Sequence, residues 1–441
     1  MKINETIDLD QHVAAWKARY TDDFTYSDGR GAAFSPAVQA QESPFGSMGT
    51  GDIPGFTSLH HVLIANDFTG WMDECKSISE TCYVGDWSWL NKWRVSGPDA
   101  IKCLEASSIN GYKKFPIGKG RHFISVTPEG KMIADCIVFR EGEDQFVLTG
   151  GINLAPGVTI RNEGFDVEIE DLTAKVFNYH IQGPNSGKVV EKLCGEDISD
   201  LEFIHFRDVT ICGQRCVLYR GGMSGELGYK IFGDASFGSV IWKDVVEAGE
   251  EFGIRQLGYR AFMTNHLQAF FPTIWIDFLP GDLPGAEAMH RYPSDFGWGG
   301  LVDKTRDFPG KDAIMAEVEN PTHKTMMLEW NNEDVKAIHD SLFDTDEEPF
   351  EQMPMPVNTS EPGEPGPMAL PVFDEDGQFV GLATNRGYSY QFRRVISITY
   401  LDTRVAEVGR ELFVLWGTEG KRQMKIRATV AEAPYKKDVR R

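Results

Sequence analysis

Short apolar runs, each bounded by turn-forming or charged residues, mark the first three quarters of the chain. We predict strands where such runs occur, at 92–96, 122–126, 132–140 and 145–149. The stretch 63–78 has a mixed spacing that resembles a helix more than a strand. The chain therefore mixes both kinds of element.

A step of proline and glycine follows several of the apolar runs and predicts where helices begin. It occurs at 97–100 (GPDA), at 183–186 (GPNS) after the apolar run 176–181, and at 308–313 (FPGKDA). Proline suits the first turn of a helix, because the N–H that it lacks would be unpaired there anyway. Strand-then-helix units that recur in this way indicate mixed α/β subdomains.

The pattern changes at about residue 324, where apolar runs alternate with polar turns. Strands are predicted at 326–330, 369–373, 379–383, 395–401 and 411–415, with one short helix at 332–342. We therefore divide the chain into a polar extension at 1–55 with a helical patch at 11–20, a mixed region at 56–323, and a mostly-β domain at 324–441. The acidic segment 344–371 carries seven prolines and predicts a solvated loop, with a substrate-covering lid as the alternative.

Composition and charge narrow the range of partners. The 441 residues include 66 acidic and 44 basic side chains, and the net charge of −22 repels nucleic-acid phosphates. The sequence has no apolar signal region near Met1 and no run of about 18 apolar residues, so we expect a cytoplasmic protein without a membrane partner. The seven cysteines fit reduced core thiols, and Cys212 and Cys216 lack a second pair at zinc spacing, so no metal site is expected.

Familiar catalytic motifs do not match. The segment 183–189 (GPNSGKV) has one residue too few between its glycines for a phosphate loop, and Val189 stands where Ser or Thr should hold magnesium. The sequence also lacks a GxGxxG, an HExxH and a GxSxG motif. No motif therefore supports a dinucleotide-binding enzyme, a zinc protease or a serine hydrolase.

Three polar residues remain as candidates for a catalytic or ligand-binding role. Asp135 lies inside an otherwise apolar strand, and a carboxylate there needs either a partner or a purpose. Glu226 lies among four glycines at 221–228, where the backbone can approach a flat ligand closely; a plain hairpin turn is the alternative. Arg260 follows a glycine turn before a helical run, and it can pair with a carboxylate ligand or with an acidic neighbour.

Taken in order, these segments resemble the folate-binding T-protein (aminomethyltransferase) family of the glycine cleavage system. The segments that carry the resemblance are 97–100, 127–138 (TPEGKMIADCIV), 182–184 (QGP), 224–229 (SGELGY), 257–261 (LGYRA), 296–298 (FGW) and 307–311 (DFPGK). Within the family, the chain is most similar to tetrahydrofolate-dependent aryl O-demethylases of the vanillate and syringate type. The segments that favour that branch are 260–262 (RAF), 264–265 (TN), 328–334 (LEWNNED), 341–344 (SLFD) and 387–390 (GYSY).

The resemblance implies a fold and a set of roles. The fold is α+β and T-protein-like, with two mixed α/β subdomains and a C-terminal β-barrel-like domain around a central folate cavity. Asp135 falls on the catalytic carboxylate near folate N5 and N10. The cofactor-binding positions are the pterin-holding acid Glu226, the arginine of the folate site Arg260, the tyrosine-equivalent His122, and the C-terminal residues Tyr388 and Arg393.

Departures from the family pattern concern the substrate pocket. Trp89 replaces a histidine of an Asp-x-Ser-His turn, Gly151 replaces an Arg or Asn, and Phe262 replaces a tyrosine of the vanillate-type enzymes. Three polar groups are absent together, which argues against a free aromatic carboxylate or phenolate as the substrate. We expect a more apolar pocket lined by aromatic residues such as Trp87 and Trp275, although some of these aromatics can simply be core.

We therefore expect an enzyme that uses tetrahydrofolate as cofactor and a small-molecule methyl or methylene donor as partner. It would transfer the group from an apolar methoxy- or methylenedioxy-aromatic substrate to folate N5, largely by orienting the reactants. One alternative is a demethylase of a sulfonium or quaternary ammonium compound such as dimethylsulfoniopropionate, held by a cage of Trp87, Trp89 and Trp93. Another is a non-catalytic folate-binding protein; aminomethyl transfer in glycine cleavage is the least favoured activity.

Overall fold

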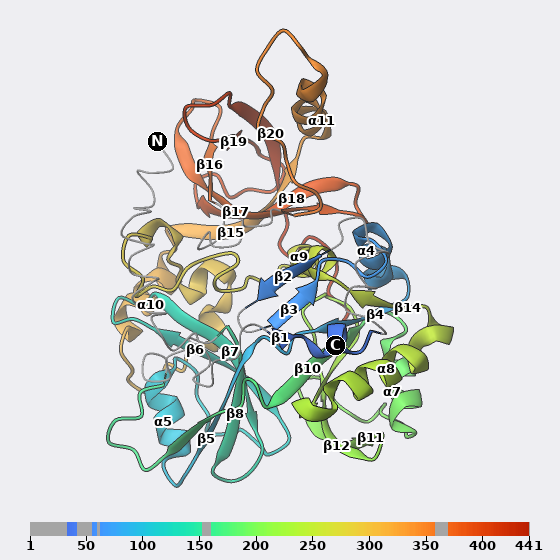
Figure 1. Cartoon of the computed structure of the whole chain (residues 1–441). Helices are drawn as coiled ribbons and strands as arrows, with labels where there is room; N and C mark the ends of the chain where they lie inside the picture. The colour runs from blue at the N-terminus through green and yellow to red at the C-terminus, as the bar shows by residue number, and fades with distance from the viewer. Residues whose placement is uncertain (1–32, 42–54, 60–61, 152–159, 358–368, 441) are drawn as a thin grey trace. The chain divides into compact units, whose positions relative to one another are not determined.

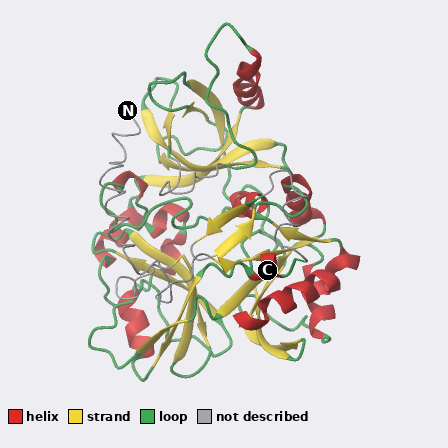
Figure 2. Ribbon diagram, in the orientation of Figure 1, coloured by secondary structure: helices red, strands yellow, loops and turns green. Residues whose placement is uncertain are grey.

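The computed structural model describes residues 33–41, 55–59, 62–151, 160–357 and 369–440. These residues form two compact units that the chain enters more than once. Of the described residues, the sheet unit comprises those within 33–125, 134–265 and 438–440, and the barrel unit comprises those within 126–133 and 266–437. Figure 1 shows the elements along the chain, and Figure 2 separates helices from strands.

The larger sheet of the sheet unit has six strands in the order β11-β12-β13-β10-β4-β14. Strand β14 pairs with β4 in parallel, and the other neighbours are antiparallel. Their bounds are β4 (Cys82–Asp86), β10 (Val176–Gln182), β11 (Phe206–Ile211), β12 (Gln214–Arg220), β13 (Gly228–Asp234) and β14 (Ile254–Leu257).

One face of this sheet is covered by helices α7 (Ser186–Cys194) and α8 (Gly238–Gly249) (Figure 1). The core between them is apolar and includes Ile181 and Ile231 from the sheet and Trp242 from α8, each almost fully buried. Helix α7 begins where the step at 183–186 predicts it. The face that carries the polar residues of β10 points the other way, because successive side chains of a strand alternate.

The second sheet of the sheet unit has five strands in the order β6-β7-β8-β5-β9. Their bounds are β5 (Asn91–Ser96), β6 (Gly120–Val126), β7 (Met132–Arg140), β8 (Gln145–Gly151) and β9 (Glu168–Asp171). Helix α5 (Ala100–Ser107) packs on it through a core that includes Trp93, Leu104 and Phe146. The first proline step therefore also opens a helix, as predicted.

A third, three-stranded sheet begins within the predicted polar extension 1–55. Strand β1 (Ala33–Phe34) pairs with β3 (Val62–Ala65), which pairs in turn with β2 (Phe56–Leu59). Helix α3 (Pro36–Gln39) follows β1 and buries Val38 completely. The apolar stretch is too short to form a recognisable period within a polar region. The helical patch predicted at 11–20 lies outside the described residues.

The predicted helix-like stretch 63–78 is a strand followed by a helix. Strand β3 ends at Ala65, and α4 (Trp71–Glu80) begins after a turn. After it come β4, the second sheet and eventually α9 (Tyr259–Ala269), whose last four residues belong to the barrel unit.

The barrel unit contains a closed barrel in the order β15-β18-β17-β16-β19-β20. The strands are β15 (His323–Trp330), β16 (Leu370–Phe373), β17 (Phe379–Ser389), β18 (Arg394–Asp402), β19 (Glu411–Trp416) and β20 (Met424–Ala431). The apolar core of the barrel includes Leu328, Val372 and Val414, all fully buried. The predicted C-terminal β-barrel-like part is confirmed, and the predicted strands at 326–330 and 395–401 fall within β15 and β18.

The barrel unit also contains elements that precede the barrel. Helix α10 (Lys311–Glu319) begins at the third proline step, and short 3-10 turns come before it at Glu287–Met289, Pro293–Phe296 and Trp298–Leu301. The barrel unit takes in the chain from His266, whereas the sequence pattern placed a boundary at 323/324. The sequence pattern does not show this boundary, because residues 266–322 have little regular secondary structure. They belong to the barrel unit through contacts with residues far away in the sequence.

The acidic segment is only partly described. Helix α11 (Asn332–Asp340) ends before a run of exposed residues at 344–349, as a solvated loop would be. Met353 and Val357 are buried, and Val357 forms a bridge with Gly387 of β17. Among the described residues, no helix is both long and apolar enough to cross a membrane.

Candidate active site

The two large sheets of the sheet unit face each other across the side chain of Phe139. This ring of β7 packs edge-on against Phe206, Tyr219 and Phe232, with ring centroids 5.4, 5.0 and 5.6 Å away. Because side chains alternate along a strand, Asp135 lies on the same side of β7 as Phe139. The carboxylate of Asp135 therefore projects from the face of β7 that is turned toward the six-stranded sheet.

Asp135 has a partner, as a buried carboxylate requires. Nε2 of His122, on the neighbouring strand β6, contacts Oδ1 of Asp135. The two side chains are only 22% and 10% exposed, so water screens the interaction little. The predicted catalytic residue and one predicted cofactor contact thus lie together. An imidazole and a carboxylate in contact can hold one proton between them or pass it on.

Gly151 of β8 is the cross-strand partner of Asp135. Because glycine has no side chain, this position adds nothing beside the carboxylate. The preceding Gly150 has a φ of +146°, and a Cβ there would meet Cβ of Cys136 at 2.8 Å. The backbone of β8 thus requires glycine at 150.

The glycine-rich turn at 221–227 is built around Gln182 of β10. Its Oε1 accepts hydrogen bonds from the backbone N–H groups of Met223 and Ser224, both at 3.1 Å, and from Oγ of Ser224 at 2.7 Å. A Cβ at Gly222 would meet that oxygen at 2.2 Å. Gly222 is therefore needed to make room for the side chain of Gln182. The sequence had suggested that the glycines of this turn make room for a ligand.

Glu226 is half-buried at the end of the same turn. Its backbone N–H donates to Oγ of Ser224 at 3.3 Å, which ties it to the Gln182 network. The last residues of the chain also hold this turn, because the Val439 N–H donates to Gly225 at 2.8 Å and the Arg440 guanidinium to Gly222 at 2.9 Å. Glu226 thus has a fixed backbone, and its role at the pterin stays a prediction.

Three of the predicted pocket aromatics gather at the end of β4. Trp87 stacks on His180 with ring centroids 4.1 Å apart and 4° between the planes, and Phe262 meets its ring edge-on at 4.7 Å. Trp89 contacts the same phenylalanine at 5.8 Å. A small pocket adjoins them, and its walls are formed by Ser35, Ala37, Ile64, Ala65, Phe68, Asp86, Trp87, Leu257 and Phe262.

Two of the three rings in the cage suggested by the sulfonium alternative pack within the protein. One face of Trp87 is covered by His180, and Trp93 is 1% exposed in the core under α5. A cation–π site needs an open ring face.

A buried lysine holds the aromatic turn. Nζ of Lys92 donates to the carbonyl oxygens of Ser88 and Leu90 at 2.9 and 2.7 Å, and the side chain is 1% exposed. Burial lowers the pKa of Lys92 to about 7. Nearby, Oδ1 and Oδ2 of Asp86 accept the N–H groups of Ser88 and Ala37. The positions of Trp87 and Trp89 are therefore set by charged groups of the protein itself.

Arg260 has an acidic neighbour inside the protein. Its guanidinium pairs with Asp67 at 2.9 Å, and the two side chains are 8% and 0% exposed. The sequence left two roles open for Arg260, pairing with an acidic neighbour or with a carboxylate ligand. The structure shows the first, and the predicted contact with folate stays a prediction.

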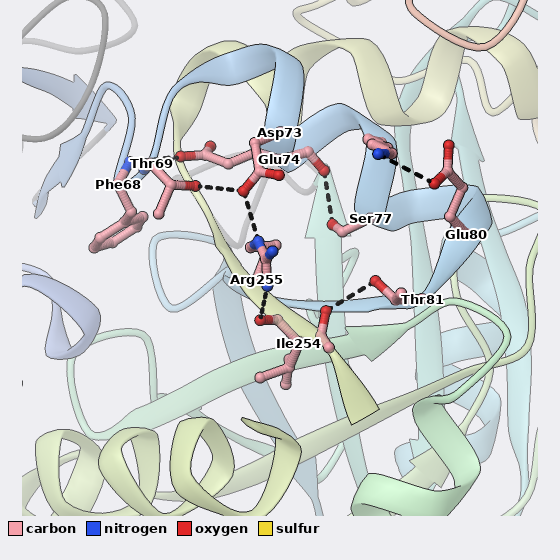
Figure 3. Close-up of polar contacts among 11 residues, drawn as sticks. Phe68, Thr69, Asp73, Glu74, Ser77, Glu80, Thr81, Ile254 and Arg255 are labelled. Atoms are coloured by element: carbon pink, nitrogen blue, oxygen red, sulfur yellow. Dashed lines mark hydrogen bonds and ion pairs between the residues drawn. The ribbon is translucent and has the colours of Figure 1, made fainter. Parts of the chain in front are cut away.

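Glu74 fixes the segment from which Asp67 projects. Its carboxylate accepts the N–H groups of Phe68, Thr69 and Gly258 at 2.6, 2.8 and 2.8 Å. Figure 3 shows this carboxylate at the start of α4, pointing back to Phe68 and Thr69. Burial raises the pKa of Glu74 to about 7, although the three donors act in the opposite direction. The carboxyl thus joins the turn after β3 to the turn before α9.

The remaining predicted residues belong to the barrel unit. Trp275 has a φ of +72°, and its N–H donates to Phe278 at 2.8 Å. Arg393 is exposed, lies 3.9 Å from the ring of Tyr390, and also hydrogen-bonds Tyr388, which raises its pKa. The roles of Trp275, Tyr388 and Arg393 in substrate or cofactor binding stay predictions.

The inner face of β10 carries polar residues that no sequence motif marks. Asn178, His180 and Gln182 alternate with Phe177, Tyr179 and Ile181, a pattern that normally indicates a solvated face. All three are nevertheless buried, and Lys230 of β13 lies opposite His180. Only the second sheet, which is distant in sequence, could reveal this burial.

The described residues offer little for a metal. They contain no group of three or more His, Cys, Asp or Glu side chains that could hold an ion. Cys212 is exposed and Cys216 buried, and all seven cysteines are free thiols.

Comparison with known proteins gives consistent relatives. The family model described as the GCVT N-terminal domain matches residues 37–290. A sesamin methylene transferase of Sinomonas sp. (strain No.22) is 32% identical, with 84% of this chain and 89% of that protein covered. A syringate O-demethylase of Sphingobium sp. (strain NBRC 103272 / SYK-6) is 26% identical with the same coverage.

A solved structure has the same fold. The crystal structure of the glycine cleavage system aminomethyltransferase T from Bartonella henselae matches with a TM-score of 0.71 and 18% identity. The match covers 92% of this chain and 99% of that one. With the mixed sheets and the closed barrel, it confirms the predicted T-protein-like fold class.

Proposed function

Because this chain belongs to the GCVT family, we propose that it is a one-carbon transferase that moves a methyl or methylene group from an oxygen-substituted aromatic compound to tetrahydrofolate. The observation that carries the proposal is Asp135, held by His122 on a strand whose face is turned toward a second, polar sheet. The names of two relatives, a sesamin methylene transferase and a syringate O-demethylase, support an aromatic oxygen compound as the donor.

The residues present fit a polar heterocyclic cofactor. Both side-chain amide atoms of Asn178 are buried and have no partner among the described residues, which suits a guest that forms hydrogen bonds. Bound tetrahydrofolate would supply a secondary amine nitrogen, N5, as acceptor of the one-carbon unit. Asp135 would hold or remove the proton at N5, and His122 would orient Asp135. Glu226 would accept N–H groups of the pterin ring, and Arg260 would face its anionic part.

The surroundings favour a neutral aromatic donor. Trp87, Trp89 and Phe262 are apolar walls, and Gly151 brings no charge to the side of Asp135. Lys230 places a cation on the face that carries His180, which disfavours a sulfonium or quaternary ammonium donor. Methoxy- and methylenedioxy-benzenes meet both conditions.

The test measures cofactor binding and turnover separately. Wild type is offered benzodioxole, veratrole, syringate, dimethylsulfoniopropionate and betaine with tetrahydrofolate, and the folate products are identified. We expect turnover of the neutral aromatics, and Asp135→Asn should lower it about 100-fold or more while tetrahydrofolate still binds. Turnover of the sulfonium or ammonium compound alone would replace the proposal, and binding without any turnover would leave a folate-binding protein.

A further inference from the structure

Strand β10 carries three polar side chains that are sealed from solvent. Asn178, His180 and Gln182 share one face of the strand and are 0%, 1% and 0% exposed. Among the described residues, both amide atoms of Asn178 and Nε2 of His180 lack a hydrogen-bond partner. Buried polar atoms in folded proteins are nearly always paired, by protein, water or ligand. These atoms therefore mark a place that is built to receive a hydrogen-bonding guest.

The proton of His180 is assigned by its neighbour Gln182. Because Oε1 of Gln182 already accepts three hydrogen bonds from Met223 and Ser224, its amide nitrogen is the end that faces His180. That nitrogen lies 3.3 Å from Nδ1 of His180, and an amide nitrogen can only donate. Nδ1 is thus the acceptor, and the proton of the neutral ring is on Nε2.

His180 stays neutral in this position. Burial, and then the nearby charge of Lys230, lower its pKa well below the ordinary value. A neutral imidazole with its proton on Nε2 is a hydrogen-bond donor without a charge. It can bind the oxygen of a neutral ether, and it can also stabilise the same oxygen once negative charge develops there.

Trp87 fixes the plane of the imidazole. The two rings are parallel, and the indole lies over Gly85, the cross-strand partner of His180 on β4. A Cβ on Gly85 would meet Cζ3 of Trp87 at 2.2 Å, so only glycine leaves room for the stack. Since Nδ1 is bound to Gln182 of the same strand, Nε2–H is the group left to donate to a guest.

Lys230 places a cation on the same face. Lys230 on β13 is the cross-strand partner of His180 on β10. The side chains of such a pair project to the same side of the sheet. Burial lowers the pKa of Lys230 to about 8, so it is still mostly protonated at neutral pH and can also release a proton. The face thus offers an uncharged donor and a proton-bearing ammonium together.

This face is turned toward the strand of Asp135. Lys230 pairs with Tyr219 of β12, and Tyr219 packs edge-on against Phe139 of β7. Asp135 lies on the same side of β7 as that phenylalanine. The carboxylate and the donors on β10 and β13 therefore lie on two sheet faces that are turned toward each other, and each face is one wall of the proposed site.

We propose that His180 and Lys230 form the subsite for the aryl oxygen that leaves during one-carbon transfer, with Nε2–H of His180 as donor to that oxygen. The inference rests on the proposed function. It adds which residues bind the oxygen of the donor compound. It commits the site to an aryl ether or methylenedioxy ring whose oxygen becomes a phenolate.

The chemistry balances across the two walls. The bond between the aryl oxygen and the transferred carbon breaks, and its electron pair stays on the oxygen. In a methyl ether the carbon would pass to the acceptor nitrogen, whose proton Asp135 would take up. In a methylenedioxy ring the second carbon–oxygen bond would break in the same way, the carbon would bond to a second nitrogen of the cofactor with loss of its proton, and the product would be a catechol. The phenolate is held by His180 and Lys230 and takes a proton from Lys230, which regains one from solvent; the product is the phenol.

The experiment reads the oxygen directly, with a coloured product analogue. Nitroguaiacol is a methoxyphenol whose ionised form absorbs visible light, so titration of the enzyme-bound compound gives its pKa. We expect the pKa of the bound probe to lie about one unit or more below that of the free compound in wild type. His180→Leu and Lys230→Met should each return it at least halfway to the free value.

Two further variants separate this effect from misfolding. His180→Gln places an amide N–H near the position of Nε2 and should keep most of the shift. His339→Leu, a histidine of α11 in the barrel unit, should keep all of it. Thermal melting of every variant checks the fold.

The outcomes distinguish the inference from the proposed function. A bound pKa equal to the free value in wild type, or an equal shift in wild type and His180→Leu, would overturn the subsite, even if aryl ethers are turned over. A shift that depends on His180, in a protein that transfers no one-carbon group to tetrahydrofolate, would uphold the oxyanion subsite and reject the proposed reaction.

Discussion

The imidazole of His122 contacts the carboxylate of Asp135 between two neighbouring strands, β6 and β7. Both side chains are largely sheltered from water. Asp135 breaks the apolar pattern of its strand, whereas no local pattern marks His122, and its pairing with Asp135 is visible only in the structure. The pair sets the first prediction.

His122 should act through Asp135. We expect His122→Phe to lower kcat about tenfold or more while KM for the aromatic donor changes little, because the carboxylate loses its orientation but stays in place. His122→Gln keeps a hydrogen-bond donor and should recover part of the rate. Equal losses in both variants, or a change in KM alone, would mean that the contact is only structural.

A cation opposite Asp135, together with a hydroxyl at the aromatic turn, should change the preferred donor. Gly151→Arg, combined with Phe262→Tyr, adds a cation and a hydroxyl where this chain has neither. We expect kcat/KM for veratrate, divided by that for veratrole, to rise about tenfold or more, because arginine binds carboxylates strongly. Steady-state kinetics with both compounds checks this; an unchanged ratio would place the substrate elsewhere.

Glu74 should make the protein less stable as the pH rises. Its carboxyl has a folded-state pKa of about 7 against an ordinary value of 4.5, so the folded protein binds this proton more tightly than the unfolded chain. The stabilisation is fully present below pH 4.5 and is lost as the pH rises toward 7, by about 3 kcal/mol in total.

Urea unfolding across this range measures the slope, with Glu74→Gln as the control. The glutamine cannot ionise, so the difference in unfolding free energy between the two proteins isolates the carboxyl. Parallel curves for both proteins would show that Glu74 titrates as it does in the unfolded chain.

The buried pair of Arg260 and Asp67 should be costly to break from one side. Asp67→Asn leaves the guanidinium without its carboxylate and should destabilise the fold by about 3–5 kcal/mol. Arg260→Met combined with Asp67→Leu should cost clearly less than the sum of the single changes, as measured by urea unfolding. Additive losses would show that the two side chains are not coupled.

The same double variant tests the predicted role of Arg260 at the cofactor. If the arginine serves only Asp67, tetrahydrofolate should bind the double variant as tightly as wild type. If it also faces the anionic part of the folate, the affinity should fall about tenfold, by the loss of one charge-assisted hydrogen bond. Calorimetric titration at a temperature where both proteins are folded distinguishes the two.

Much of the fold could be predicted because its signals are local. The proline steps correctly place the starts of α5, α7 and α10, since the residues that favour a helix start are next to each other in sequence. The barrel strands also follow from their apolar runs. Helix α3 was missed because only its contact with α8 and β4, far along the chain, explains why Val38 is buried.

The candidate site divides in the same way. Asp135 was found because a charge inside an apolar strand is conspicuous in the sequence. His180 was missed because it lies in the run 176–181 and no sequence motif marks it, and only the packing of Phe139 against the facing sheet shows that its polar face is turned inward. Arg260 was found, but its pairing with Asp67 joins segments that are 193 residues apart.

Laboratory evolution toward larger donor compounds should treat the glycines of this region unequally. A methyl group at residue 85 would displace the indole of Trp87, and one at 222 would strike the amide of Gln182, each with a separation of 2.2 Å. Libraries that randomise these two codons should therefore yield mostly inactive clones, whatever the selection. Diversity belongs at 151 and 262, where a new side chain changes which molecule is accepted and leaves the imidazole of His180 in place.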